Sequence, residues 1–327
     1  MDSIIDSFRG KKVLIVGDVM VDAYIMGKVE RLSPEAPVPV VNIEDKDSRL
    51  GGAANVALNI IALGAEPILC SVIGQDQEGT DFIRLMDDRG MLTKGIVESA
   101  KRRTTTKTRI LGNKHQLLRL DNEVTTDINE QENDALINVY RKYIDVCDVV
   151  ILEDYNKGVL TEDNIPMLID IALKAGKPVA VDPKKKNFLS YKHVTLFKPN
   201  LKEIREGLNS DLNLKDHHNL ETVVEELHRI LNNTYTMVTL SEDGVMITDH
   251  NQYDFIPAHV RHISDVSGAG DTVISVASLC LATGVERRMI ADLANLAGGL
   301  VCEETGVVPI DVEKLKKEAQ YLTYSSH

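Results

Sequence analysis

The stretch Val149-Val150-Ile151-Leu152-Glu153-Asp154-Tyr155 joins an uninterrupted apolar run to two acidic residues and a tyrosine. An apolar run of this length without alternation is typical of a strand that is buried on both faces, as in a parallel sheet. In open sheets of parallel strands, ligands bind beyond the carboxyl ends of the strands. The polar residues after this run therefore stand where a functional site is expected.

The same pattern recurs along the chain. Further short apolar runs occupy residues 13–16, 68–73, 179–181, 195–197 and 237–240. Amphipathic patterns of helical period lie between them, at residues 53–63, 80–89, 130–143, 161–175, 201–208 and 220–231. Polar residues again follow the strands, at Gly17-Asp18, Asp182-Pro183, Lys198-Pro199-Asn200 and Ser241-Glu242. This alternation predicts an α/β fold with a doubly wound, mainly parallel sheet flanked by helices.

Two stretches interrupt the alternation, at about residues 22–48 and 96–120. Both contain strand-like runs without a helix between them, which predicts a small antiparallel β lid inserted into a single domain that spans residues 1–327. The edge strands of such a lid would expose unpaired backbone groups unless something covers them. A homodimer formed through the lid is therefore plausible.

Composition narrows the class of partner. The 327 residues include 37 Lys and Arg against 50 Asp and Glu, a net charge of −13, which disfavours binding to nucleic acid or to anionic membranes. No secretory pattern opens the chain, and the apolar stretch 273–285 is too short to span a bilayer, so we expect a cytoplasmic protein. The four cysteines are far apart and read as buried free thiols. A small-molecule ligand is the expected partner.

The segment Asp265-Val266-Ser267-Gly268-Ala269-Gly270-Asp271 precedes an apolar run of helical length. Free N–H groups at a helix start, with glycines that admit close approach, form a site for phosphate. A carboxylate at Asp271 could accept a proton from an attacking hydroxyl. Taken alone, the segment also fits a Gly-rich loop with a carboxylate that stabilises the helix N-terminus.

Two further motifs offer polar groups at helix starts. Gly51-Gly52-Ala53-Ala54-Asn55 permits close backbone approach, and Asn55 with Asp18 and Asp22 could bind the hydroxyls of a polyol, although a tight turn with a surface Asn is the alternative. Asn200-Leu201-Lys202-Glu203 places an amide and a carboxylate on one helix face, where they could hold the water shell of Mg²⁺. The alternative for this pair is an N-cap Asn with a first-turn Glu.

Together the three motifs resemble the signatures of the ribokinase-like, or PfkB-type, carbohydrate kinases, in the same order and over nearly the whole chain. Val266 departs from the family's usual Thr. The resemblance implies an ATP-dependent sugar kinase in which Asp271 is the base and the backbone around Gly268, Ala269 and Gly270 stabilises the transferred group. It also implies that Asn200 and Glu203 organise Mg²⁺, through water, and the phosphates of ATP.

The resemblance assigns further positions. Sugar contacts are expected from Asp18, Asp22, Gly51, Gly52 and Asn55. Nucleotide contacts are expected from Thr239, Ser241, Glu242 and Gly244, with Asn295 as a weaker candidate on the adenine side. Asp265 and Ser267 match the positions of a monovalent cation site, so the resemblance also implies K⁺ as a cofactor.

A narrower similarity concerns the segments 17–22, 31–40, 118–121 and 154–160, which look like the kinase half of the bifunctional D-glycero-D-manno-heptose 7-phosphate kinase/adenylyltransferases of lipopolysaccharide precursor synthesis. It implies phosphorylation of the C1 hydroxyl of the heptose 7-phosphate to the 1,7-bisphosphate. Arg109, Arg119 and Lys157, beside the lid cations Arg102, Arg103 and Lys107, would then bind the substrate phosphate. Because the chain ends soon after the kinase region, a separate nucleotidyltransferase is expected to act later in the pathway.

Three alternatives stand beside this interpretation. A fructokinase- or ribokinase-like enzyme would act on an unphosphorylated sugar, and a non-catalytic sugar sensor would bind one without turnover. A nicotinamide oxidoreductase shares the predicted sheet, but no Gly-x-Gly-x-x-Gly follows the first predicted strand.

Overall fold

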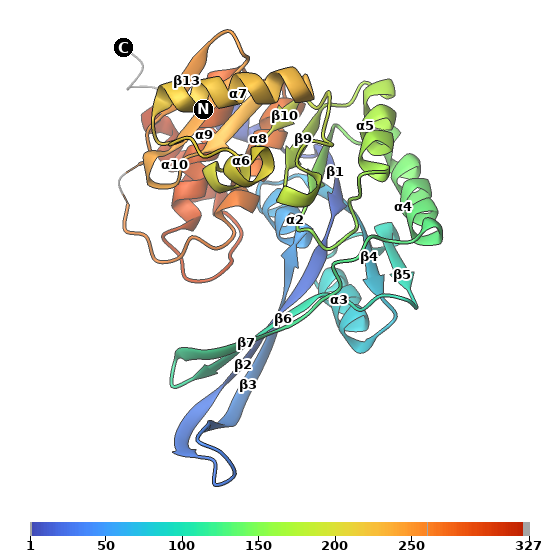
Figure 1. The fold of residues 1–327 in the computed structure, drawn as a ribbon, viewed down its shortest axis with the longest axis vertical. Coiled ribbons are helices and arrows are strands. Elements are labelled where there is room, and N and C mark those ends of the chain that lie inside the picture. The colour runs from blue at the N-terminus through green and yellow to red at the C-terminus, as the bar shows by residue number, and fades with distance from the viewer. Residues whose placement is uncertain (1, 260, 323–327) are drawn as a thin grey trace.

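The computed structural model describes residues 2–259 and 261–322, and its centre is a sheet between two layers of helices (Figure 1). Nine strands form this sheet in the order β13-β12-β11-β10-β9-β8-β1-β4-β5. They are β1 (Lys12–Gly17), β4 (Glu66–Gly74), β5 (Ile96–Ser99), β8 (Val149–Glu153), β9 (Val179–Asp182), β10 (Leu196–Phe197), β11 (Tyr235–Thr239), β12 (Val245–Thr248) and β13 (Tyr253–Ile256). All neighbours pair in parallel except β11–β12 and β12–β13. The predicted fold class is confirmed.

Helices cover both faces of the sheet. One face carries α1 (Asp2–Asp6), α2 (Ala53–Ala62), α3 (Gln77–Asp87), α8 (Ala269–Ala282), α9 (Arg287–Val301) and α10 (Val312–Leu322). The other carries α4 (Glu130–Tyr143), α5 (Asn164–Lys174), α6 (Leu201–Leu208) and α7 (His217–Leu231). Short 3₁₀ turns lie at Thr93–Gly95, Ile144–Val146, Lys185–Asn187 and Ser241–Asp243. No helix within the described ranges is both long and apolar enough to cross a bilayer.

Two apolar cores result from the alternation of side chains along the strands. In β1, Val13 and Ile15 enter the core beneath α2 and α8, whereas Leu14 and Val16 enter the core beneath α4 and α5. Because both faces are buried, these strands read as continuous apolar runs in the sequence. Cys70, Cys147 and Cys280 are buried free thiols in these cores, as predicted, and Cys302 is partly exposed.

The lid is a second sheet of four strands that projects from the body (Figure 1). It contains β2 (Val19–Leu32), β3 (Pro39–Gly52), β6 (Thr106–Gly112) and β7 (His115–Asn122), in the order β3-β2-β6-β7. Each hairpin is antiparallel, but β2 and β6 pair in parallel. The predicted second segment, 96–120, starts too early, because Ile96–Ser99 pairs with β4 in the main sheet. The first segment is longer than predicted, since β2 and β3 run into the site motifs at both ends.

Candidate active site

The segment 265–271 forms the turn that starts α8. Gly268 is the N-cap residue with φ of 80°, a left-handed conformation that favours glycine, and Ala269 is the first helical residue. A Cβ on Gly268 would also lie 3.1 Å from the amide nitrogen of Asn55. The predicted helix start is therefore correct, and its first N–H groups are close to the motif at residues 51–55.

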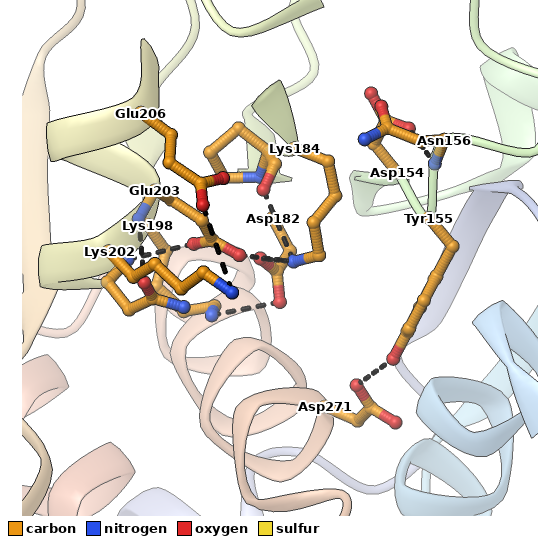
Figure 2. Close-up of polar contacts among 12 residues, drawn as sticks. Asp154, Tyr155, Asn156, Asp182, Lys184, Lys198, Lys202, Glu203, Glu206 and Asp271 are labelled. Carbon is orange, nitrogen blue, oxygen red and sulfur yellow. Dashed lines mark hydrogen bonds and ion pairs between the residues drawn. The ribbon is translucent and has the colours of Figure 1, made fainter. Parts of the chain in front are cut away.

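Asp271 lies in the first turn of α8 and is 6% exposed. Its carboxylate accepts hydrogen bonds from Asn55 Nδ2 at 2.6 Å and from the Tyr155 hydroxyl at 2.7 Å, the second of which Figure 2 shows. Burial raises the pKa of Asp271 to about 6, while these two hydrogen bonds act to lower it. At neutral pH most of the carboxylate is ionised and can accept a proton.

The motif at 51–55 brings Asn55 to this carboxylate. Gly51 lies against Asp22, whose Oδ2 would be 2.3 Å from a Cβ at position 51. Gly52 has φ of 62° and precedes the first residue of α2. The side-chain oxygen of Asn55 is buried and has no hydrogen-bond partner within the described chain. A buried acceptor in this state is suited to a ligand hydroxyl.

Asp18, a predicted sugar contact, already has hydrogen-bond partners within the protein. Its carboxylate is 1% exposed and accepts backbone N–H groups of Tyr155 at 2.9 Å, Lys157 at 3.0 Å and Val159 at 2.9 Å. Burial, and then the nearby charge of Asp154, raise the pKa of Asp18 to about 6, against the lowering effect of these amides. With both oxygens engaged, Asp18 holds the 155–159 loop and so positions Tyr155 beside Asp271.

Three buried carboxylates gather at the ends of neighbouring elements. Glu153 ends β8, Asp182 ends β9, and each has an oxygen within 4.8 Å of the other and of Asp271. Glu153 is fully buried, and neither of its oxygens has a partner among the described residues. Burial, followed by the charges of Asp182 and Asp271, raises the pKa of Glu153 well above its usual range. This donor set fits a divalent cation, which prefers carboxylate oxygens.

Two lysines balance part of this charge. Lys198 Nζ lies 2.9 Å from Asp182 Oδ2, and Lys184 Nζ lies 3.2 Å from Asp182 Oδ1 and 2.5 Å from Glu203 Oε1 (Figure 2). Burial would raise the pKa of Asp182, but the two lysines outweigh it and lower the pKa. Asp182 is thus held ionised. The sequence shows that these lysines and carboxylates follow predicted strands. Only the structure shows that they lie close together and form one charged cluster.

Asn200 and Glu203 form a reciprocal cap at the start of α6. Asn200 Oδ1 accepts the N–H of Glu203 at 2.9 Å, and Glu203 Oε2 accepts the N–H of Asn200 at 2.9 Å. The structural alternative considered for this motif is thus realised. Glu203 Oε1 accepts a hydrogen bond from Lys184, which also donates to Asp182, so the cap places a carboxylate at the edge of the acidic group.

Three of the residues predicted to contact the nucleotide lie at the end of β11 and in the turn that follows it. Thr239 ends β11 and forms a backbone bridge with Asn200. Gly244 has φ of 99°, and a Cβ there would lie 2.1 Å from the carbonyl oxygen of Ile256, so the β11–β12 turn requires glycine. Ser241 also has a positive φ, of 56°.

Two other predicted nucleotide residues already have protein partners. Glu242 is exposed and forms an ion pair with Lys215 at 3.0 Å. Asn295 in α9 donates to the carbonyl of Pro257 at 2.9 Å, which ties α9 to the segment after β13. Asn295 is 9% exposed, and this hydrogen bond gives it a structural role.

Asp265 closes the loop before α8. Its carboxylate accepts the N–H of Ser267 at 2.9 Å and the N–H of Gly306 at 3.1 Å. The hydrogen bonds from Ser267 are the main reason that the pKa of Asp265 is lowered. These hydrogen bonds join the turn before α8 to the segment after α9.

The lid presents basic residues to the site. Arg109 of β6 donates to Asp22 at 2.5 Å, and its guanidinium lies 5.3 Å from the ring centre of Tyr24. Arg49 of β3 lies 4.9 Å from the same ring, and its cross-strand neighbour is Asp22. Arg49 and Tyr24 were absent from the predicted site, because only strand register places them beside Arg109.

Three of the other predicted cations, Arg119, Lys157 and Arg102, have local partners. Arg119 forms an ion pair with Asp121 at 2.8 Å, and Lys157 forms one with Glu123 at 2.8 Å. Arg102 donates to the backbone carbonyls of Thr126 and Lys157, so it connects two loops. Among these, Arg119 is the most exposed side chain, at 50%.

Comparison with known proteins agrees with this geometry. A family model described as pfkB family carbohydrate kinase matches residues 10–314. The protein named bifunctional protein HldE from Desulfatibacillum aliphaticivorans is 39% identical over 96% of this chain and 64% of its own length. The namesake from Wolinella succinogenes is 38% identical over 99% of this chain and 67% of its own. The chain thus spans about two thirds of the length of these relatives.

Solved structures agree in fold. Escherichia coli phosphofructokinase-2 in complex with fructose-6-phosphate superposes with a TM-score of 0.76 at 18% identity, covering 96% of this chain and 99% of the other. Arabidopsis thaliana ribokinase complexed with ribose and ATP has a TM-score of 0.73 at 15% identity, covering 94% and 99%. At these identities the similarity concerns the fold alone.

Proposed function

Since this chain belongs to the pfkB family of carbohydrate kinases and is therefore a sugar kinase, we propose that it transfers the γ-phosphate of ATP to the C1 hydroxyl of D-glycero-D-manno-heptose 7-phosphate. The observation that carries the reaction is the placement of Asp271. A buried carboxylate with two hydrogen-bond donors stands in the first turn of a helix, where the N–H groups of Gly270 and Asp271 have no backbone partner among the described residues and that of Ala269 donates to the carbonyl of Val266 at 3.3 Å.

Asp271 would accept the proton of the sugar hydroxyl as the hydroxyl oxygen attacks the γ-phosphorus. Asn55 and Tyr155 hold its carboxylate in a fixed orientation, and the pKa of about 6 keeps it ionised at neutral pH. Phosphoryl transfer depends more on position and charge stabilisation than on base strength. The amides of Gly268, Ala269 and Gly270 would stabilise the charge on the transferred group.

A divalent cation bound with ATP supplies charge neutralisation of the phosphates. The residues that would hold it are Glu203 and Asn200, through water, together with the buried carboxylates of Glu153 and Asp182. The two unpartnered oxygens of Glu153 support this assignment. We also propose that the loop closed by Asp265 and Ser267 binds K⁺. Escherichia coli phosphofructokinase-2, which has a similar fold, has been solved in complex with potassium.

Recognition of a phosphate already on the sugar falls to the lid. Arg109 and Arg49 stand on either strand neighbouring Tyr24, close to Asp22 and thus to Gly51. Guanidinium groups bind phosphate oxygens in pairs, and stacking on a ring orients them in advance. Arg119 of β7 and Lys157 of the 155–159 loop are further candidates. This arrangement favours a phosphorylated sugar over a free one.

The lid also supports the proposed homodimer. Leu118 and Leu120 of β7 are 52% and 50% exposed and, two residues apart, share one face of the strand. Ile43 of β3 is 54% exposed. Apolar side chains of this size on a sheet with open edges suit contact with a second copy. The cytoplasmic location and the separate nucleotidyltransferase stay predictions.

An ADP-release assay with Mg·ATP tests the substrate. Fructose, ribose, fructose 6-phosphate and D-glycero-D-manno-heptose 7-phosphate are compared at equal concentration, and we expect the heptose 7-phosphate to give the highest kcat/KM. Arg109→Gln should raise KM for the phosphosugar at least ~10-fold, the size of a lost charged hydrogen bond, with a smaller change in KM for ATP. Lys28→Gln is the matched control, because Lys28 is a lid cation paired with Glu44. Turnover confined to ribose or fructose would refute the heptose assignment and retain the kinase.

A further inference from the structure

Lys198 is a buried cation that follows β10 directly. Its side chain is 3% exposed, and its ammonium lies 2.9 Å from Asp182 Oδ2. Figure 2 shows the side chain directed at Asp182, next to the ribbon of α8. A lysine is rarely buried to this degree without a specific task, since removing an ammonium from water is costly.

The ammonium faces the first turn of α8. A Cβ built on Gly270 would lie 3.7 Å from Lys198 Nζ and 3.6 Å from Asp182 Oδ2, which are the nearest atoms outside its chain neighbours and the adjacent backbone of α8. Gly270 therefore leaves a space between the Lys198–Asp182 pair and the backbone of the proposed anion hole. The positive charge of Lys198 also acts to lower the pKa of Asp271, the next residue.

The neighbouring Lys184 provides a contrast. Its ammonium has three acceptors, Asp182 at 3.2 Å, the carbonyl of Pro183 at 3.2 Å and Glu203 at 2.5 Å. An ammonium has three N–H donors, so those of Lys184 are all matched. For Lys198, the contacts among the described residues comprise Asp182 alone. Two of its N–H groups are thus available to a ligand at the start of α8.

We propose that Lys198 is a catalytic residue whose ammonium donates hydrogen bonds to the γ-phosphoryl group during transfer, while Asp182 holds the ammonium in place. This inference rests on the proposed anion hole of α8. As the sugar oxygen bonds to phosphorus, the bond from phosphorus to the β–γ bridging oxygen breaks, its electron pair leaves with ADP, and the sugar proton passes to Asp271. Lys198 gains and loses no proton; it stabilises the negative charge spread over the phosphoryl oxygens.

The first test measures binding of a mimic of the transferred group. The affinity for MgADP is determined by calorimetry with and without aluminium fluoride, in the absence of sugar, so that the result is independent of the acceptor. We expect aluminium fluoride to tighten binding in the wild type, and Lys198→Met to lose most of this gain while its affinity for MgADP alone is nearly unchanged. Its kcat should fall at least ~100-fold, as for loss of one oxyanion donor. Lys184→Met, which removes the same charge from the same carboxylate, should keep most of the gain.

Two further variants are needed in case Lys198→Met does not fold, because this substitution removes one of the two cations that pair with the buried carboxylate of Asp182. Asp182→Asn and the double variant Asp182→Asn/Lys198→Met differ only in Lys198, and replacing both members of a buried pair is often tolerated. In the single variant the amide oxygen at position 182 can still accept a hydrogen bond from the ammonium of Lys198, so this variant should retain part of the gain, which the double variant lacks. The proposed role of Lys198 would be refuted if aluminium fluoride tightened MgADP binding equally in these two variants, or if Lys198→Met and Lys184→Met lost the effect equally. Neither result would bear on the anion hole. No gain in the wild type would refute the anion hole itself.

Discussion

Replacing Asp271 with asparagine should make the protein more stable at neutral pH while it removes activity. The carboxylate is buried, and asparagine has the same shape without the charge. Tyr155 can still donate to the side-chain oxygen at position 271. Asn55 can turn its amide so that its unpartnered oxygen accepts from the new NH₂ group. The substitution therefore relieves the cost of burying a charge and leaves both hydrogen bonds available.

The magnitude follows from the raised pKa of Asp271. Between its ordinary value of 3.8 and about 6, the folded state binds more protons than the unfolded state, so the stability contributed by this group falls as pH rises through that window. A difference of about 2 units corresponds to about 3 kcal/mol. Much of that change is complete by pH 5, which leaves roughly 1.4 kcal/mol between pH 5 and pH 8. Relative to wild type, Asp271→Asn should gain that amount over this range.

Urea unfolding of both proteins at pH 5, 6.5 and 8 measures the change, and an ADP-release assay on the same preparations measures turnover. Turnover should fall at least ~100-fold because the proton acceptor is lost. Asp170→Asn is a suitable control, since Asp170 is an exposed helix residue paired with Lys174. If the stability difference does not change with pH, or if the folded variant turns over near the normal rate, the assignment of Asp271 as a buried base is wrong.

Two further results are expected. The acid limb of kcat/KM should lie near pH 6 and reflect Asp271, which acts only when it is ionised. The variant Tyr155→Phe removes a hydrogen bond that lowers the pKa of Asp271, so a pH–rate series should show the acid limb at a higher pH than in the wild type. An acid limb at the same pH in both proteins would argue against the contact. The double variant Leu118→Asp/Leu120→Asp should be monomeric by sedimentation velocity at a concentration where the wild type is dimeric, because it places charges on the exposed apolar face of β7. A wild type that is itself monomeric would refute the proposed dimer.

Much of the body of the fold was predictable because its signals are local. Strands such as β1 and β8 are buried on both faces, so their sequences are continuous apolar runs. Helix α7 begins at His217, three residues before the predicted 220, because Asp216 accepts the N–H of Asn219 and extends the helix start. The predicted start of the second lid segment is wrong because the sequence of residues 96–99 indicates a strand but does not show which sheet that strand joins. Its pairing with β4 places it in the main sheet.

The site was partly predictable. The turn at 265–271 carries its own signature, since a left-handed glycine and a first-turn carboxylate are properties of adjacent residues. Asp18 was predicted to contact the sugar, but three amides from a loop about 140 residues away surround its carboxylate. No local pattern could reveal those partners, because hydrogen bonds between distant segments depend on how the strands are ordered in the sheet.

By itself, the sequence determined the fold class, the family and Asp271 as the candidate base, because periodicity and short motifs express backbone geometry directly. Tertiary structure alone decided which side chains meet that base. It brought Asn55 and Tyr155 to Asp271, grouped Glu153 with Asp182, and set Lys198 against the first turn of α8. The physical reason is that charge and hydrogen-bond energies depend on distances of a few ångströms, and strand order brings together residues that lie far apart in the chain.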